Sequence, residues 1–439
     1  MAGISIGKLA AACSLSALMS VPVMGEVTVL GWPGGPEEVA LRKVIEVYNA
    51  QPGVSENDKV EALFFNREGF WDKLQSDLAA GTKEFDINLT ATYSLGRYAP
   101  YMEPITLTSN DAYDDKVLAT MQYDGKQYGV PTDLSLHFMY YRTDLMDKLL
   151  SDPDWQAQYK AIAKEHFGKE MMPVSPEAWT WDDYTVTALF FAKKQNRQSP
   201  VRYGTVLQMK NLLFNMMIWH SAVKAYGGNW LNDSGEVTVD SNAFKNALTR
   251  YRNLYDAGSS PKDSLSYEYA EANAAFGAGQ VATMLQWNAA AGDLTDATKN
   301  PTIAGKVGIA PPPSGPSGRF THVHGLGFGL NKASENKEGA LKFLNWLATA
   351  DAAKAYALAG GNPALKQSVV ADIVDQRPDL KTLGEYAGEY GFVMNGGTSK
   401  NALTVYEVQA REFTGYWAGQ QSLDAALDNT EEAMQELLK

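Results

Sequence analysis

Short apolar strands and amphipathic helices alternate along the first part of the chain. Residues 26–30 alternate polar and β-branched side chains, a pattern that predicts a strand, and the Gly/Pro-rich stretch 31–36 ends it. Residues 39–48 then place apolar side chains at helical spacing behind two carboxylates, Glu37 and Glu38, which suit a helix N-terminus. This segment therefore predicts a strand–loop–helix unit.

The same unit recurs further along the chain. Residues 60–65 predict a second strand, residues 70–80 a helix that ends at Gly81, and residues 85–89 a short buried strand. Because strands that alternate with helices form parallel sheets, the predicted fold class is α/β. Ligands of such sheets bind in the loops beyond the carboxyl ends of the strands, so polar and aromatic residues in those loops are the first candidates for a site.

The N-terminal 25 residues follow another pattern. Lys8 precedes an apolar run over residues 9–24, and small residues allow cleavage before Glu26, which predicts an export signal. A membrane anchor would need about 20 apolar residues, and this run is shorter and interrupted by serines. Cys13, the one cysteine, lies inside the run, but the run continues past it, which argues against a lipidated N-terminus. The exported chain is expected to lack disulfides and to rely on a large core.

Length and charge narrow the class of protein. The chain has 439 residues, 45% of them hydrophobic, which predicts a globular protein of about two domains. Its 38 basic and 51 acidic residues give a net charge of −13 without a basic cluster, which argues against nucleic acid as a partner. No stretch after the export signal has 18 apolar residues free of charges, so no transmembrane helix is expected.

Seven motifs in the chain resemble, in order and spacing, the maltose-binding type of extracellular solute-binding protein that serves bacterial ABC importers. They lie at residues 70–87, 123–131, 140–145, 179–184, 227–230, 276–284 and 340–347. Much of this pattern has a structural explanation. Gly125 predicts a hairpin turn, Thr180 with Asp183 a helix N-cap, and Phe343 with Trp346 one core face of a helix. The motifs thus point to the family and its fold, and they leave the ligand open.

The resemblance implies a two-lobe periplasmic-binding-protein fold with hinge crossings and a central ligand cleft. Its crossings would fall near residues 131–134, 307–313 and 360–363. The expected organisation is a signal peptide at residues 1–25, an N-terminal lobe at 26–133 and 312–360, and a C-terminal lobe at 134–311 and 361–439. Residues 151–178 are longer and more charged than in the family, and they are expected either to cap the second lobe or to shape one end of the cleft.

A sugar is a ligand that such a cleft could recognise by simple chemistry. Its apolar faces stack on flat aromatic rings, and its hydroxyls pair with carboxylate, amide and guanidinium groups. Aromatic candidates from loop positions are Trp32, Tyr93 and Trp287, and the resemblance adds Tyr406 and Trp219. Each of these rings could equally well belong to the core.

Polar candidates lie at the ends of strands and at the crossings. They are Asn66, Arg67, Asp133, Ser135, His220, Asn288, His324 and Asn362, with His220 drawn from the resemblance. Asp133 directly follows Val130-Pro131 at the first crossing, although it could be an ordinary turn aspartate. Arg67 could equally be a solvated surface residue.

Other chemistries fit the sequence less well. His322 and His324 are two residues apart, but no third metal ligand lies nearby, so no metal and no cofactor are expected. The glycines at positions 325, 327 and 329 have the wrong spacing for a dinucleotide fingerprint. A glycosidase needs a pair of facing carboxylates, and the candidate loops offer one, Asp133.

The sequence thus predicts a non-enzymatic, monomeric periplasmic protein that binds a sugar or oligosaccharide and delivers it to a membrane ABC permease. One alternative keeps the fold and changes the ligand to a polyol or to a sulfonated or carboxylated osmolyte, held by Arg67 and the two histidines. A second alternative is a secreted glycosidase.

Overall fold

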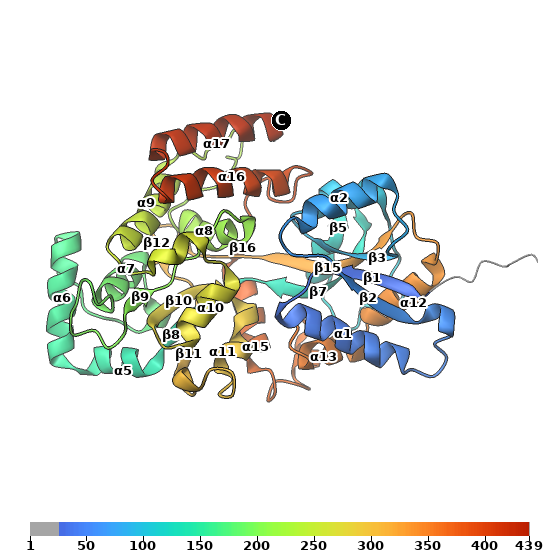
Figure 1. Cartoon of the computed structure of the whole chain (residues 1–439), viewed down its shortest axis with the longest axis horizontal. Coiled ribbons are helices and arrows are strands. Elements are labelled where there is room, and N and C mark those ends of the chain that lie inside the picture. Colours follow the sequence, from blue (N-terminus) through green and yellow to red (C-terminus); the bar gives the residue numbers. More distant parts are fainter. Residues whose placement is uncertain (1–25, 439) are drawn as a thin grey trace, which may run out of the picture.

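Two α/β lobes lie side by side in the computed structural model, which describes residues 26–438 (Figure 1). The predicted export signal at residues 1–25, with Cys13, lies outside the described residues. Between residues 26 and 438, no helix has the length and apolar character needed to cross a membrane.

The first lobe is built on a six-stranded sheet in the order β2-β1-β3-β15-β4, with β7 also paired to β15. As predicted, β1 pairs in parallel with β2 and β3, whereas β15 is antiparallel to β3, β4 and β7. Its strands are β1 (Val27–Gly31), β2 (Val60–Phe64), β3 (Ile87–Ala91), β4 (Met102–Glu103), β7 (Gly129–Ser135) and β15 (His324–Asn331). Its main helices are α1 (Gly35–Asn49), α2 (Phe70–Ala80), α12 (Lys337–Leu347) and α13 (Ala350–Leu358).

The second lobe surrounds a four-stranded sheet in the order β11-β8-β10-β9. Its strands are β8 (His137–Arg142), β9 (Tyr203–Thr205), β10 (Val281–Trp287) and β11 (Val307–Ala310). The helices between these strands are α5 (Thr143–Ser151), α6 (Pro153–Phe167), α7 (Trp181–Phe190), α8 (Leu213–Ala225), α9 (Asn242–Asp256), α10 (Tyr269–Gly277) and α11 (Ala291–Thr295). The chain ends in α15 (Pro378–Tyr390), α16 (Ala402–Trp417) and α17 (Leu423–Leu437), of which α16 packs on α8.

Three local predictions are confirmed by the backbone. Gly81 ends α2 in the left-handed conformation, with φ of 68°. Gly125, with φ of 71°, lies in the turn between β5 (Gln122–Tyr123) and β6 (Lys126–Gln127). Thr180 and Asp183 form a reciprocal capping box at the start of α7, which satisfies two backbone donors at that helix end.

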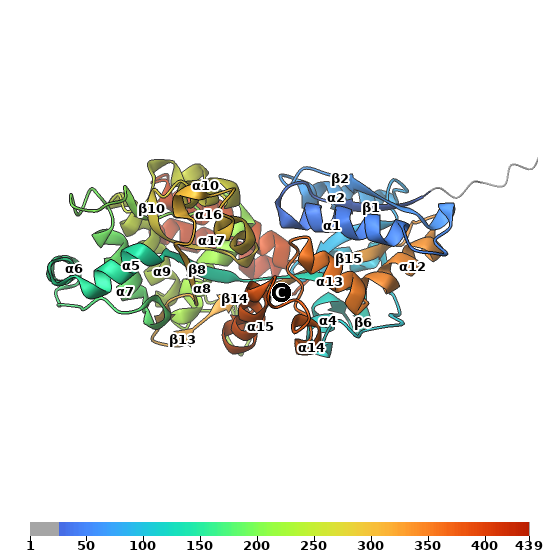
Figure 2. The same ribbon diagram turned by 90° about the horizontal axis from the view of Figure 1, so that it is seen from below.

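Strands β7 and β15 run between the two lobes (Figures 1 and 2). The sequence predicts a crossing near residues 307–313, but residues 307–310 form β11 and pair with β8 in the second sheet. The following hairpin, β12 (Ser314–Gly315) with β13 (Gly318–Arg319), packs on α8. The chain therefore returns to the first lobe at β15, about a dozen residues later than the expected boundary at 312.

The insertion at residues 151–178 covers the far end of the second lobe. It contains α6, which packs on α7 at the end of the molecule opposite the first lobe (Figure 1). Trp155 anchors α6, because its ring lies 5.4 Å from that of Phe190 and 5.8 Å from that of Phe191. Of the two expected roles, the insertion has the first: it caps the lobe.

Candidate functional site

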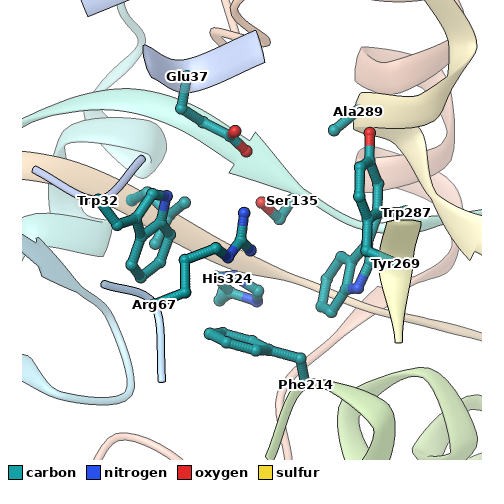
Figure 3. A pocket seen from close by; sticks show the side chains of 10 residues that line it. Trp32, Glu37, Arg67, Ser135, Phe214, Tyr269, Trp287, Ala289 and His324 are labelled. Atoms are coloured by element: carbon teal, nitrogen blue, oxygen red, sulfur yellow. The ribbon is translucent and has the colours of Figure 1, made fainter. Parts of the chain in front are cut away.

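A small cavity lies where the two lobes face each other (Figure 3). The first lobe contributes the loops after β1 and β2, the first turn of α1 and the ends of β7 and β15 that reach the second lobe. The second lobe contributes the end of β10 and the starts of α8 and α10. The lining residues are Trp32, Glu37, Arg67, Ser135, Phe214, Tyr269, Trp287, Ala289, His324 and Leu326. Loops at the ends of strands therefore build the cavity, as expected for α/β lobes.

Aromatic rings wall the cavity on both sides. Trp32 from the first lobe and Phe214 from the second meet edge to face, with ring centroids 5.9 Å apart. The guanidinium of Arg67 lies 4.9 Å from the ring centroid of Trp32 and 5.7 Å from that of Phe214. Trp287 packs on His324 with ring centroids 5.1 Å apart. The site thus combines flat apolar surface with one cation.

Several polar atoms around this cavity have no hydrogen-bond partner anywhere in residues 26–438, although they are buried. They are Trp32 Nε1, Glu37 Oε2, Arg67 Nε, Tyr269 Oη and His324 Nδ1. An unsatisfied buried polar group costs about 1–3 kcal/mol, and most proteins have few of them. These five atoms around one cavity are thus available to bond a molecule bound there.

The ionisation of these groups follows from their burial. Burial raises the pKa of the Glu37 carboxyl, an effect that the nearby Arg67 guanidinium opposes. Burial lowers the pKa of His324 to about 3, so its imidazole is neutral and offers one donor and one acceptor. With the indole N–H of Trp32 and the guanidinium N–H of Arg67 as donors and Glu37 as acceptor, the arrangement suits a small ligand whose groups both donate and accept.

This chemistry agrees with the comparisons with known proteins. The sequence matches the family of bacterial extracellular solute-binding proteins over residues 43–382. The chain belongs to this family. A binding protein of Brucella abortus (strain 2308) is 27% identical to this solute-binding protein over 354 residues, which cover 77% of this chain and 76% of the relative.

Two solved structures have the same fold. Maltose-bound MalE3 of T. maritima superposes with a TM-score of 0.77 at 22% identity, covering 94% of this chain and 99% of MalE3. An ABC transporter solute-binding protein of Thermotoga lettingae bound with α-D-tagatose gives a TM-score of 0.76 at 19% identity, covering 94% of this chain and all of that protein. The predicted two-lobe periplasmic-binding-protein fold is therefore confirmed.

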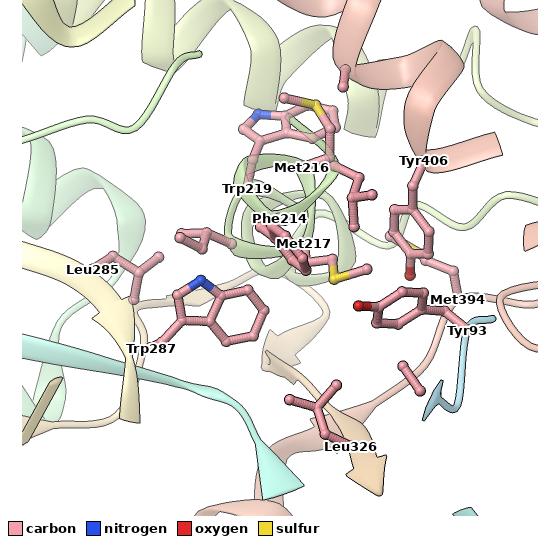
Figure 4. Close-up of a cluster of buried hydrophobic side chains, with 14 of the residues drawn as sticks. Tyr93, Phe214, Met216, Met217, Trp219, Leu285, Trp287, Leu326, Met394 and Tyr406 are labelled. Carbon is pink, nitrogen blue, oxygen red and sulfur yellow. The ribbon is translucent and has the colours of Figure 1, made fainter. Parts of the chain in front are cut away.

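The structure brings five of the sequence-derived candidates of this solute-binding protein into the cavity. They are Trp32, Arg67, Ser135, Trp287 and His324. Tyr93 lies one layer behind, with its ring 5.0 Å from that of His324 and 6.1 Å from that of Tyr406 (Figure 4). Asn66 is exposed and lies outside the cavity lining.

Three other candidates hold the crossings between the lobes instead of lining the cavity. The carboxylate of Asp133 accepts hydrogen bonds from the Tyr356 hydroxyl and from the backbone N–H of Asn362, the latter at 2.8 Å. The side-chain oxygen of Asn288 accepts from Leu136 N at 2.9 Å. The side-chain nitrogen of Asn288 also donates to the Leu134 carbonyl of β7 at 3.3 Å. Asn362 bonds Asp133 through its backbone, whereas its side-chain oxygen accepts from Arg377 Nη2 at 3.0 Å. The side chains of Asp133 and Asn288 therefore hold the crossing region around β7.

The three candidates that came from the family resemblance are core residues in this structure. Trp219 (Figure 4) has no exposed surface and packs against Phe413 and Trp417 from α16, because every residue of α8 except Lys224 is buried. His220 bonds Gln409 at 2.7 Å, and the Tyr406 hydroxyl bonds His322 Nε2 at 2.7 Å. None of the three lines the cavity.

Sequence reasoning missed three residues that line the cavity with polar or aromatic side chains. Glu37 had a sufficient local explanation as a carboxylate at a helix N-terminus. Phe214 and Tyr269 lie at the starts of α8 and α10, and no loop motif in the sequence distinguishes them from core aromatics. The one available signal was positional, because all three begin helices that follow strands or loops of the cleft.

Proposed function

We propose that this solute-binding protein binds a small polyhydroxylated solute, a sugar or a polyol, in the cavity between its lobes and delivers it to a membrane ABC permease. The observation that carries the proposal is the set of unpartnered donors and acceptors beside aromatic walls. A hydroxyl both donates and accepts, so adjacent hydroxyls could satisfy Glu37, Arg67 and His324 together. Sugar C–H faces could stack on Trp32 or Trp287. The maltose and tagatose bound by the two structural relatives support this class of ligand.

Binding without catalysis is part of the proposal. Glycoside hydrolysis uses two carboxyl groups on either side of the scissile bond. Among the described residues that line the cavity, Glu37 supplies the one carboxylate, and both oxygens of Asp133 are engaged with the hinge. The export of the protein to the periplasm, cleavage before Glu26 and action as a monomer belong to the same proposal.

A thermal-shift screen tests the proposal. The protein of residues 26–439 is mixed with monosaccharides, hexitols, disaccharides and longer oligosaccharides, and its melting temperature is recorded. A ligand present at 100 times its dissociation constant stabilises the folded state by about 2.7 kcal/mol, which the screen resolves.

Two arginine variants make the test specific for the cavity. Arg67→Gln should lose the response to any ligand found, because it removes the cation from the lining. Arg202→Gln changes an exposed arginine on the second lobe and should keep the response. If no member of the screen shifts the wild-type melting temperature, or if Arg67→Gln responds as the wild type does, the proposed ligand class is wrong.

A further inference from the structure

Glu37 is the feature of the cavity that says most about which solutes enter it. It lies in the first turn of α1 and points into the cavity toward Arg67 and Ser135 (Figure 3). Its Oε2 is buried and accepts no hydrogen bond from any residue in the range 26–438. A buried carboxylate oxygen without a donor costs stability, and a donor from a bound solute would offset that cost.

Positive charge around the cavity is scarce. Arg67 is the one cation among the described lining residues, and its guanidinium lies over the rings of Trp32 and Phe214. His324 is neutral, because burial lowers its pKa to about 3. The histidines therefore add no charge that could attract an anion.

Two further carboxyl groups lie near Glu37. Glu268, which precedes α10 on the second lobe, acts electrostatically on Glu37 and raises its pKa. Asp133 lines a neighbouring recess that shares Trp32, Glu37 and Leu326 with the main cavity. Glu37 in turn raises the pKa of Asp133, which burial brings to about 7. Glu37 is therefore the carboxylate through which the cavity meets a bound solute, and its neighbours Glu268 and Asp133 supply no counter-charge for it.

From this arrangement we infer that the cavity admits neutral or cationic hydroxylated solutes and rejects anionic ones, with Glu37 as the specificity-determining residue. The inference rests on the proposed function and narrows it. A hydroxyl that donates to Glu37 Oε2 and accepts from Arg67 Nε satisfies both orphaned groups at once. An ammonium group would pair with Glu37 directly. A solute carboxylate or sulfonate would face Glu37 at short range, and two like charges repel strongly at a site shielded from water.

Matched sets of probes test this selectivity. Each set holds a hexose, its hexuronate and its 2-amino-2-deoxy derivative, in the gluco, galacto and manno configurations, together with the corresponding hexitols. Thermal shift identifies the sets that bind, and calorimetry gives the dissociation constants. Neutral or amino members should bind the wild type at least tenfold more tightly than the hexuronate of the same set.

Glu37→Gln is the decisive variant. It should weaken the binding of the neutral member about ten- to a hundredfold, because it replaces a charge-assisted hydrogen bond, and it should bind the hexuronate more tightly than the wild type does. Glu46→Gln makes the same change at an exposed position of α1, and it should bind as the wild type does. Tighter binding of a hexuronate by the wild type, or unchanged affinities in Glu37→Gln, would overturn the inference.

A measurement without ligand separates this inference from the proposed function. Because Glu37 Oε2 is buried without a hydrogen-bond partner among residues 26–438, Glu37→Gln should melt at a higher temperature than the ligand-free wild type, and Glu46→Gln should not. If no probe of any set binds, the sugar proposal fails, while a raised melting temperature still supports Glu37 as a ligand-directed residue. Melting of Glu37→Gln below the wild type would show a structural role for Glu37 and would overturn the inference by itself.

Discussion

Four of the five histidines of the protein are buried together where the two lobes meet. They come from four elements: His137 from β8, His220 from α8, His322 from β14 (Thr321–His322) and His324 from β15. The ring centroid of His322 lies 5.8 Å from that of His324, 6.3 Å from that of His137 and 6.4 Å from that of His220. Burial lowers the pKa of all four, to about 3 for His220 and His324.

This cluster predicts that mild acid destabilises the protein. The folded state holds the four imidazoles neutral, whereas the unfolded chain protonates them below pH of about 6.5. Stability is therefore lost as the pH falls through 6.5, by about 2 kcal/mol for each histidine at pH 5 and about 8 kcal/mol for the four.

Buried carboxyls oppose part of this loss. Burial raises the pKa of Asp133 to about 7, so the folded state takes up a proton between pH 7 and pH 5 that the unfolded chain does not, which returns about 2 kcal/mol. Burial also raises the pKa of Glu37 and of Glu407, which act in the same direction. A net loss of several kcal/mol remains, a large part of the 5–15 kcal/mol typical of folded proteins.

Urea unfolding at pH 7 and pH 5, followed by circular dichroism, measures the loss. His322→Gln keeps a polar partner for Tyr406 and removes one titrating ring, so its loss between the two pH values should be about 2 kcal/mol smaller than that of the wild type. His166→Gln changes the exposed fifth histidine and should leave the loss unchanged. Equal unfolding free energies of the wild type at the two pH values, within about 1 kcal/mol, would refute the reasoning.

Further predictions concern the walls of the cavity, the hinge and the N-terminus. Trp287→Ala removes a ring from the cavity wall and should weaken ligand binding about tenfold or more in a calorimetric titration. Trp219→Ala changes a core residue instead. It should lower the unfolding free energy by about 3–5 kcal/mol and leave the affinity of the folded protein unchanged. Asp133→Ala leaves the Tyr356 hydroxyl and the Asn362 N–H without their acceptor, so it should cost about 2–6 kcal/mol in urea unfolding, and an unchanged midpoint would contradict its hinge role. Small-angle scattering should give a smaller radius of gyration when the ligand found by screening is added, if the lobes close on it. Mass analysis of the protein purified from an exporting cell should find Glu26 as the first residue, and an intact Met1 would contradict the export prediction.

The periodicity of the sequence predicts single elements well and their assembly poorly. Strands β1 and β2 and helix α2 lie within two residues of the predicted ranges, because each has its own apolar pattern and its own end signal, such as Gly81. The pairing of β15 with β3 joins residues more than 230 positions apart, and no local pattern encodes it. The glycines of β15 also depend on a long-range contact that no local pattern encodes. A side chain at Gly327 would collide with the Val130 carbonyl of the adjacent strand, so close strand packing explains a spacing that matches no nucleotide motif.

The site could be predicted in part for a similar reason. Trp32 and Arg67 are found from sequence because each follows a strand whose end is visible in the pattern. Trp219 and Tyr406 lie on helices, and which face of a helix turns toward the cleft depends on the neighbours that α8 and α16 find in three dimensions. Glu37 could not be predicted as a site residue, because a carboxylate in the first turn of a helix is favourable even when no ligand is present.

The place of β15 in the first sheet has a consequence for how the chain folds. β15 lies between β3 and β4 and also pairs with β7. This central strand is complete only when residue 331 of 439 has been synthesised, after roughly three quarters of the chain. Such long-range pairings slow folding. A growing chain that has reached α11 would carry β1, β2 and β3 with the inner edge of β3 still unpaired, a surface open to wrong partners. We therefore expect refolding from urea to be slow and to aggregate at high protein concentration, and a fragment that ends before residue 324 to remain unfolded in its first lobe.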